Sequence, residues 1–86
     1  MAEKILIADD EQDIVSMLDS YFTRRGYKVL RAYSGAEAVR LAERAPDVIL
    51  LDVGLPDMDG LEVCRRTRAY VSCPIVFLTA RVEDAD

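Results

Sequence analysis

The stretch that decides the fold is VILLDVGLPDMDGLEV, residues 48–63. It opens with an apolar run, reaches Asp52, passes through a short loop containing glycine and proline, and enters an amphipathic segment. A run that is apolar at every position favours a strand buried on both faces, which is typical of parallel sheets covered by helices. A strand, a loop and a helix in this order predict one unit of an α/β fold.

Segments of the same kind recur on both sides of this stretch. The predicted strands comprise residues 4–8, 27–32, 47–51 and 74–78. Between them, apolar residues at helical spacing predict three amphipathic helices. This alternation implies a doubly wound parallel α/β sheet with right-handed crossovers. We therefore expect a single domain over residues 1–86 and no second domain in this chain.

Local signals set the ends of the predicted helices. Gly26 is expected to stop the first helix, and Ser34 to cap the second, with Glu37 completing a capping box. Asp59 is placed to cap the third helix, which we expect to continue to about Tyr70. The apolar residues expected to pack in that third helix are Leu61, Val63 and Cys64.

The composition excludes several classes of site. The 86 residues have a net charge of -5 and no histidine, which rules out Ser-His-Asp, Cys-His and histidine–metal sites. The acidic balance argues against this segment binding a nucleic-acid backbone by itself. Cys64 and Cys73 are too few for a disulfide scaffold and are expected to be reduced thiols. The first apolar run is too short for a signal peptide or membrane span, so we expect a cytoplasmic protein that binds no membrane.

Oxygen-bearing side chains follow three of the four predicted strands. Asp9 and Asp10 follow the first strand, Asp52 the third and Thr79 the fourth. Ligands of open parallel sheets bind beyond the carboxyl ends of the strands, and neighbouring strands lie about 4.8 Å apart. If the first and third strands are neighbours, the three aspartates form a cluster. Two like charges at about 4 Å repel by roughly 1 to 4 kcal/mol, which favours a bound cation or a raised pKa.

An all-oxygen site without histidine or thiolate suits Mg²⁺ or Mn²⁺. A carboxylate beside such a metal can also accept a phosphoryl group as an aspartyl phosphate. Asp52 has this setting, because the small Gly54 would let a backbone oxygen approach the metal, and Thr79 could donate to a phosphoryl oxygen. Taken singly, each residue also has a structural interpretation, as a helix start, a turn aspartate or a strand-end threonine.

Three segments together resemble the receiver domain of two-component response regulators. They are KILIADDE (4–11), VILLDVGLPDMDGLEV (48–63) and IVFLTAR (75–81), in the order and spacing of that family. The resemblance spans the whole chain. It implies the flavodoxin-like receiver fold with strand order 2-1-3-4-5, and a phosphorelay signalling module rather than an enzyme.

The resemblance implies a role for each matched acidic residue. Asp52 would be the phosphoacceptor, receiving the phosphoryl group from a sensor histidine kinase. Asp10 would bind Mg²⁺ directly, and Asp9 would do so directly or through water. The Gly54 backbone carbonyl would complete the metal ligands that the protein supplies, together with Asp52.

Residues beyond the acidic cluster are implied as well. Thr79 and the Ala80 backbone would hold the phosphoryl group, Pro56 would shape the loop after the phosphoacceptor, and Gly60 would let the third helix begin close by. The motifs GLPDMDG (54–60) and LTAR (78–81) resemble those of bacterial transcription regulators of the OmpR/PhoB type. This resemblance implies that DNA is bound only through a winged-helix output domain that is not part of this chain.

The family's fold has five strand–helix units, and this sequence supplies four strands and three helices. The expectation is a receiver truncated after its fourth strand, without the fourth helix, fifth strand and fifth helix. No lysine of this chain, neither Lys4 nor Lys28, falls where the family places a lysine beside the phosphoryl group. The strand at 74–78 would then be an apolar exposed edge through which copies associate.

Two alternatives to an active receiver remain open at this stage. One is a phosphorylation-incompetent interaction fragment that associates through its fourth strand. The other is a phosphatase that forms an aspartyl phosphate, which the sequence disfavours because Gly54 stands where such enzymes place a second acid.

Overall fold

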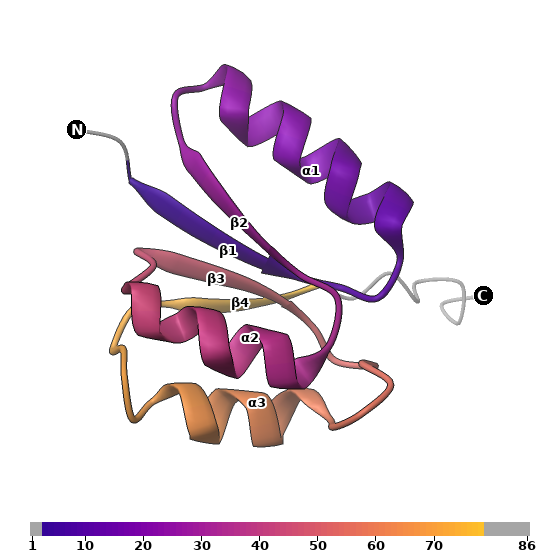
Figure 1. Ribbon diagram of the computed structural model, residues 1–86, viewed down its shortest axis with the longest axis vertical. Helices are drawn as coiled ribbons and strands as arrows, with labels where there is room; N and C mark the ends of the chain where they lie inside the picture. Colours follow the sequence, from indigo (N-terminus) through magenta and orange to yellow (C-terminus); the bar gives the residue numbers. More distant parts are fainter. Residues whose placement is uncertain (1–2, 79–86) are drawn as a thin grey trace.

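The structure is a computed structural model that describes residues 3–78. Four parallel strands form one sheet in the order β2-β1-β3-β4 (Figure 1). The strands are β1 (Lys4–Ala8), β2 (Lys28–Ala32), β3 (Val48–Asp52) and β4 (Ile75–Leu78). The helices are α1 (Gln12–Arg24), α2 (Gly35–Leu41), α3 (Gly60–Thr67) and the short 3-10 helix η1 (Ala42–Arg44). The predicted parallel α/β fold and the relative order of its four strands are confirmed.

The sheet lies between two layers of helices. In Figure 1, α1 covers one face, and α2 and α3 lie together on the other. β1 is buried on both faces because Ile5 and Ile7 pack with Val15 of α1, whereas Leu6 and Ala8 belong to the larger core on the opposite face. Placing apolar side chains on both faces of β1 explains why it occupies the interior of the sheet.

The strands begin or end one residue away from three predicted bounds. β2 starts at Lys28 rather than residue 27, β3 runs over 48–52 rather than 47–51, and β4 starts at Ile75 rather than residue 74. Hydrogen bonding to β3 nevertheless begins one residue before β4, because the Pro74 carbonyl accepts the N–H of Ile49 at 3.1 Å. The main consequence is that Asp52 is the last residue of β3.

Two helix signals act as predicted. Gly26 has a φ of 94°, and it follows α1 with its N–H donated to Thr23 O while the Tyr27 N–H reaches Phe22 O, which is a Schellman ending. Ser34 Oγ accepts the N–H of Glu37 at 3.2 Å. The Glu37 side chain accepts from the N–H of Tyr33, one residue before the position that a capping box would use.

The prediction for the third helix is correct at its start and wrong at its end. Asp59 Oδ1 accepts the N–H of Glu62 at 2.8 Å, as expected of a cap. The helix ends at Thr67 instead of continuing to about Tyr70, because the Tyr70 and Val71 N–H groups both turn back to Thr67 O and bring Val71 into the core.

The predicted apolar residues of α3 divide between core and surface. Val63 is fully buried and Cys64 is half-buried, but Leu61 is 74% exposed and does not pack in the core. Both cysteines are free thiols, as predicted. Among the described residues, no helix is long and apolar enough to cross a membrane.

Candidate functional site

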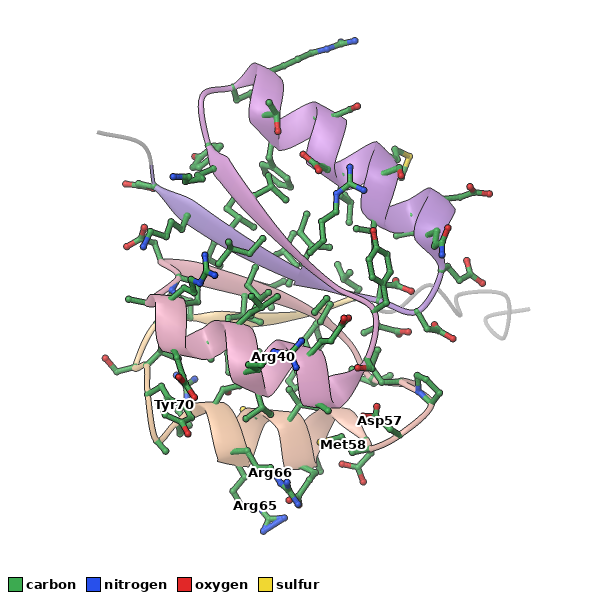
Figure 2. All side chains as sticks on the ribbon, viewed as in Figure 1. Arg40, Asp57, Met58, Arg65, Arg66 and Tyr70 are labelled. Atoms are coloured by element: carbon green, nitrogen blue, oxygen red, sulfur yellow. The ribbon has the colours of Figure 1, made fainter. Side chains whose placement is uncertain are left out.

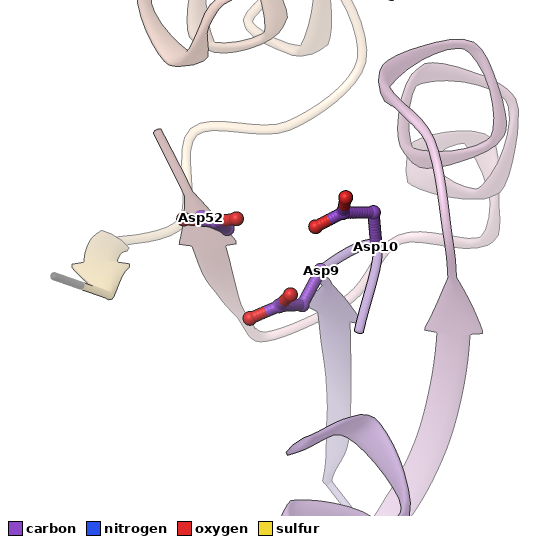
Figure 3. Close-up of side chains that lie close together, drawn as sticks. All are labelled: Asp9, Asp10 and Asp52. Atoms are coloured by element: carbon purple, nitrogen blue, oxygen red, sulfur yellow. The ribbon is translucent and has the colours of Figure 1, made fainter. Parts of the chain in front are cut away.

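Three aspartates meet at the carboxyl edge of the two interior strands. Ala8 of β1 lies opposite Leu51 of β3, so the residues that follow them, Asp9 and Asp52, come side by side. One carboxylate oxygen from each of Asp9, Asp10 and Asp52 lies within 4.8 Å of the others (Figure 3). The juxtaposition predicted from strand order is therefore present.

Asp9 is the buried member of this acidic cluster. The residue is 4% exposed, and its Oδ1 accepts the N–H of Glu11 at 2.9 Å, which orients the carboxylate before α1 begins. Its own N–H donates to Ala32 O in β2. Burial raises the pKa of Asp9, and the neighbouring charges of Asp52 and Asp10 act in the same direction, against the lowering by the Glu11 hydrogen bond.

Asp10 and Asp52 are more accessible. Asp10 is exposed, whereas Asp52 is half-buried at the end of β3 and accepts the Gly54 N–H through Oδ1 at 3.3 Å. The cluster thus combines one constrained carboxylate with two that face solvent to different degrees. That combination leaves oxygen atoms available for a ligand above the sheet edge.

The donor set fits a hard divalent cation. All three side chains offer oxygen, and none of the ion pairs formed among residues 3–78 involves Asp9, Asp10 or Asp52. With no basic partner among residues 3–78, the three acidic groups have a charge that a Mg²⁺ or Mn²⁺ ion would offset. An acidic triad of this kind agrees with the Mg²⁺ site that the sequence resemblance to receiver domains implies.

The loop after Asp52 is fixed by short-range contacts. Leu55 is buried in the core, and the Gly60 N–H donates to Val53 O at 3.2 Å, which closes the loop where α3 starts. A Cβ on Gly60 would lie 3.1 Å from Val53 Cα and from Phe77 Cε1. Glycine is therefore what lets α3 begin so close to β3.

The sequence-predicted residues divide into three groups. Asp9, Asp10 and Asp52 are brought together, with Gly54 in the adjoining loop. Pro56 and Gly60 lie further along that loop, Pro56 exposed and Gly60 buried. The expectations for Thr79 and Ala80 lie outside the described residues.

Sequence reasoning missed Asp57. Its carboxylate accepts the N–H groups of Gly35 and Ala36 at the start of α2. The only available signal was an acidic residue after a proline, and this pair is common in ordinary turns. Its partners lie more than 20 residues away, so no local pattern identifies them.

An open hollow of about 390 Å³ adjoins the site without containing it. Its lining residues are Val53, Asp59, Gly60, Leu61 and Phe77. None of the three clustered carboxylates belongs to this lining, so the hollow and the acidic cluster are separate features.

Comparison with known proteins identifies the family. The family model for the response regulator receiver domain matches residues 5–86. The chain belongs to this family. Receiver domains of two-component signalling accept phosphoryl groups from histidine kinases and are not enzymes that turn over a separate substrate.

Solved receiver structures are similar over most of this chain. The receiver domain of the hybrid histidine kinase CckA has a TM-score of 0.82 and 33% identity, covering 86% of this chain and 72% of that one. The chemotaxis protein CheY4 of Vibrio cholerae has a TM-score of 0.84 and 32% identity, covering 99% and 77%. A two-component response regulator from Clostridium difficile has a TM-score of 0.82 and 29% identity, covering 94% and 70%.

Proposed function

We propose that this receiver domain accepts a phosphoryl group on Asp52, with Mg²⁺ held by the acidic cluster, from the phosphohistidine of a sensor kinase. The observation that carries the proposal is the convergence of Asp9, Asp10 and Asp52 within 4.8 Å at the sheet edge. Family membership supports the reaction class, and the geometry of the three carboxylates supports the choice among them.

Asp52 is the best placed of the three to form a new bond. Asp9 is almost fully buried, and one of its oxygens is committed to the Glu11 N–H. Asp10 stands on the same short segment as Asp9, where both can reach one cation. Asp52 approaches from the other strand and is half-buried, and within residues 3–78 its carboxylate accepts only a long hydrogen bond from Gly54.

The phosphoryl transfer needs no reactant other than Asp52 and the phosphohistidine. An Asp52 carboxylate oxygen forms a bond to phosphorus, and the bond from phosphorus to the donor's imidazole nitrogen breaks, leaving that electron pair on the imidazole. Bound Mg²⁺ would offset the negative charge of the phosphoryl oxygens. Asp9 and Asp10 would hold the ion together with Asp52 and the Gly54 carbonyl, in keeping with the preference of Mg²⁺ for a few carboxylates and water.

Phosphorylation by a small donor tests this function. The chain is incubated with acetyl phosphate and Mg²⁺, and intact mass is measured for the wild type, Asp52→Asn and Asp59→Asn. We expect one added phosphoryl group on the wild type and on Asp59→Asn, and none on Asp52→Asn or in the presence of EDTA. Equal labelling of all three proteins would place the acceptor elsewhere.

Beryllofluoride provides a second readout that does not require turnover. With Mg²⁺ it mimics a phosphorylated aspartate, so backbone NMR signals near Asp52, and that of Thr79, are expected to shift. Thr79 and Ala80 are proposed phosphoryl contacts on the strength of the LTAR resemblance, and their response tests that assignment. Spectra that stay unchanged at saturating beryllofluoride would contradict an intact pocket.

We infer that the output is transcription control through a separate DNA-binding domain of the OmpR/PhoB type. The support is the sequence motif of residues 54–60 and 78–81. The net charge of -5 adds to it, because it disfavours DNA binding by this domain itself. The coding sequence that follows residue 86 decides the point. A winged-helix domain there would support the proposal, and a domain of another class would contradict it.

An alternative role is self-association through β4. Among residues 3–78, β4 pairs only with β3, and Val76 and Phe77 are 48% and 37% exposed. An apolar strand at a sheet edge is a template for pairing with a second copy. Sedimentation of the 86-residue chain would show a concentration-dependent dimer that Val76→Lys removes; a monomer at all concentrations would rule it out.

A further inference from the structure

Asp57 ties the β3–α3 loop to a helix that lies elsewhere in the sequence. Its Oδ1 accepts the N–H of Gly35 at 2.7 Å, and its Oδ2 accepts the N–H of Ala36 at 2.9 Å. Figure 2 shows Asp57 in the loop beside the N-terminal end of α2. Both oxygens of one carboxylate are therefore committed to the first turn of α2.

The contact is also sterically close. A Cβ on Gly35 would overlap Met58 Cγ and lie 3.1 Å from Asp57 Oδ1. The absence of a side chain at Gly35 is what allows residues 57 and 58 to reach the backbone of α2. The loop and the helix are thus fitted to each other at adjoining positions.

The start of α2 does not depend on Asp57 alone. Ser34 already caps it by accepting the Glu37 N–H at 3.2 Å. Asp57 satisfies two further N–H groups, and the positive end of the helix favours its negative charge. These two hydrogen bonds lower the pKa of Asp57, so the carboxylate remains ionised and the tie persists near neutral pH.

The contact between Asp57 and α2 lies only three residues from Gly54, whose backbone adjoins the acidic cluster. Leu55 is fixed in the core, and only Pro56, whose ring restricts its φ, separates it from Asp57. Gly54 directly precedes Leu55. Two adjoining fixed points therefore limit how far the segment just after Asp52 can move.

We propose that Asp57 is a positioning residue for the acidic pocket, holding the β3–α3 loop and its Gly54 backbone in the arrangement that binds Mg²⁺. The proposal rests on the function proposed above, since it concerns the ion that Asp9, Asp10 and Asp52 would bind. It assigns to one loop carboxylate a role in metal affinity that is separate from capping.

The test is a Mg²⁺ titration of the ¹⁵N-labelled chain, followed through the backbone signals of Asp10 and Gly54. Mutating a residue that orients a metal ligand typically weakens metal binding by about 10- to 100-fold. Because Asp57 acts through two intervening residues, we expect Asp57→Ala to weaken Mg²⁺ binding by about threefold to tenfold. Asp57→Asn keeps one acceptor oxygen and provides an intermediate variant if Asp57→Ala does not fold.

Two matched variants separate positioning from other effects. Ser34→Ala removes a cap of α2 without touching the loop, and is expected to keep the wild-type Mg²⁺ affinity. Asp59→Asn removes the same charge from the same loop, and is expected to change the affinity by less than about twofold at a salt concentration that screens distant charges. Equal weakening by Asp57→Ala and either control, or none by Asp57→Ala, overturns the proposal.

Hydrogen exchange of the Gly60 amide gives a readout without metal. This N–H bonds to Val53 O inside the loop, so Asp57→Ala is expected to speed its exchange while Ser34→Ala leaves it unchanged. An unchanged Gly60 exchange rate in Asp57→Ala would also overturn the proposal. If the wild type itself fails to respond to Mg²⁺, the proposed function fails, and the exchange comparison still decides whether Asp57 restrains the loop.

Discussion

Gly60 donates its N–H to the Val53 carbonyl oxygen at 3.2 Å, and a side chain at Gly60 would press on the Val53 backbone. This relationship places the first residue of α3 against the segment that follows Asp52. Because the obstacle is backbone as well as the Phe77 ring, a larger residue cannot be accommodated by a rotamer change alone. The packing of α3 and the shape of the site loop are consequently linked.

Gly60→Ala is expected to lower the free energy of unfolding by about 1 to 3 kcal/mol, the usual cost of overfilling a packed position. At a position that can hold a side chain, replacing glycine by alanine otherwise stabilises a protein by about 0.4 to 1 kcal/mol, because it lowers the entropy of the unfolded chain. The sign of the change in the free energy of unfolding therefore shows whether the steric cost at Val53 or the lower backbone entropy of alanine dominates. Urea unfolding of both proteins measures it, and an increase in stability would show that the Val53 backbone yields.

Asp9→Asn is expected to stabilise the metal-free chain and weaken its response to Mg²⁺. Asn keeps the oxygen that accepts the Glu11 N–H, but removes a charge that burial and the nearby Asp52 and Asp10 disfavour. Relief of such functional strain commonly adds about 0.5 to 2 kcal/mol. The melting temperature is measured in EDTA and in Mg²⁺. A variant that is less stable than the wild type in EDTA would contradict the picture of three repelling carboxylates.

The acidic cluster could be predicted from the sequence because two strong patterns combine with the strand order that the family resemblance implies. Continuous apolar runs in β1 and β3 identify interior strands, and aspartates directly follow or end both. Once such strands are neighbours, Asp9 and Asp52 must meet, so the site follows from topology and needs no side-chain detail.

The errors arise where tertiary contacts override local pattern. Leu61 reads as a packing residue of α3 but faces outward, because helix spacing alone does not fix which stripe meets the sheet. The end of α3 was overestimated because Val71 turns back into the core. Asp57 was missed because its partners are the backbone N–H groups of Gly35 and Ala36, which no sequence motif identifies.

Asp19 joins α1 to β2 through hydrogen bonds to both of its carboxylate oxygens. Thr23 Oγ1 donates to its Oδ1 at 2.7 Å and Arg31 Nε to its Oδ2 at 2.5 Å. The Thr23 hydrogen bond and then the hydrogen bond and charge of Arg31 lower the pKa of Asp19. An acid with a lowered folded pKa stabilises the fold above its unfolded value of about 4, and this contribution is lost as pH falls through the folded pKa.

Asp19→Asn is accordingly expected to cost about 0.2 to 1 kcal/mol at neutral pH, a range that allows for the partial exposure of Arg31. The difference from the wild type is expected to vanish once the wild-type aspartate is protonated in acid. Melting temperatures measured from pH 7 downward test this. A difference that is the same at all pH values would mean that the carboxylate charge contributes nothing.

Thr67 is a fully buried polar residue whose hydroxyl we expect to be dispensable for stability. Its Oγ1 donates to Cys64 O at 3.1 Å, and that carbonyl also accepts the N–H of Arg68 at 3.1 Å. Removing the hydroxyl leaves no buried acceptor unpaired, and valine has nearly the same shape, so Thr67→Val is expected to change stability by less than about 0.5 kcal/mol or to increase it. Val63→Ala, at a fully buried apolar position of the same helix, is the contrasting variant and is expected to cost about 1.5 to 3 kcal/mol. A loss for Thr67→Val as large as that of Val63→Ala in urea unfolding would mean that the hydroxyl makes a contribution beyond its bond to Cys64.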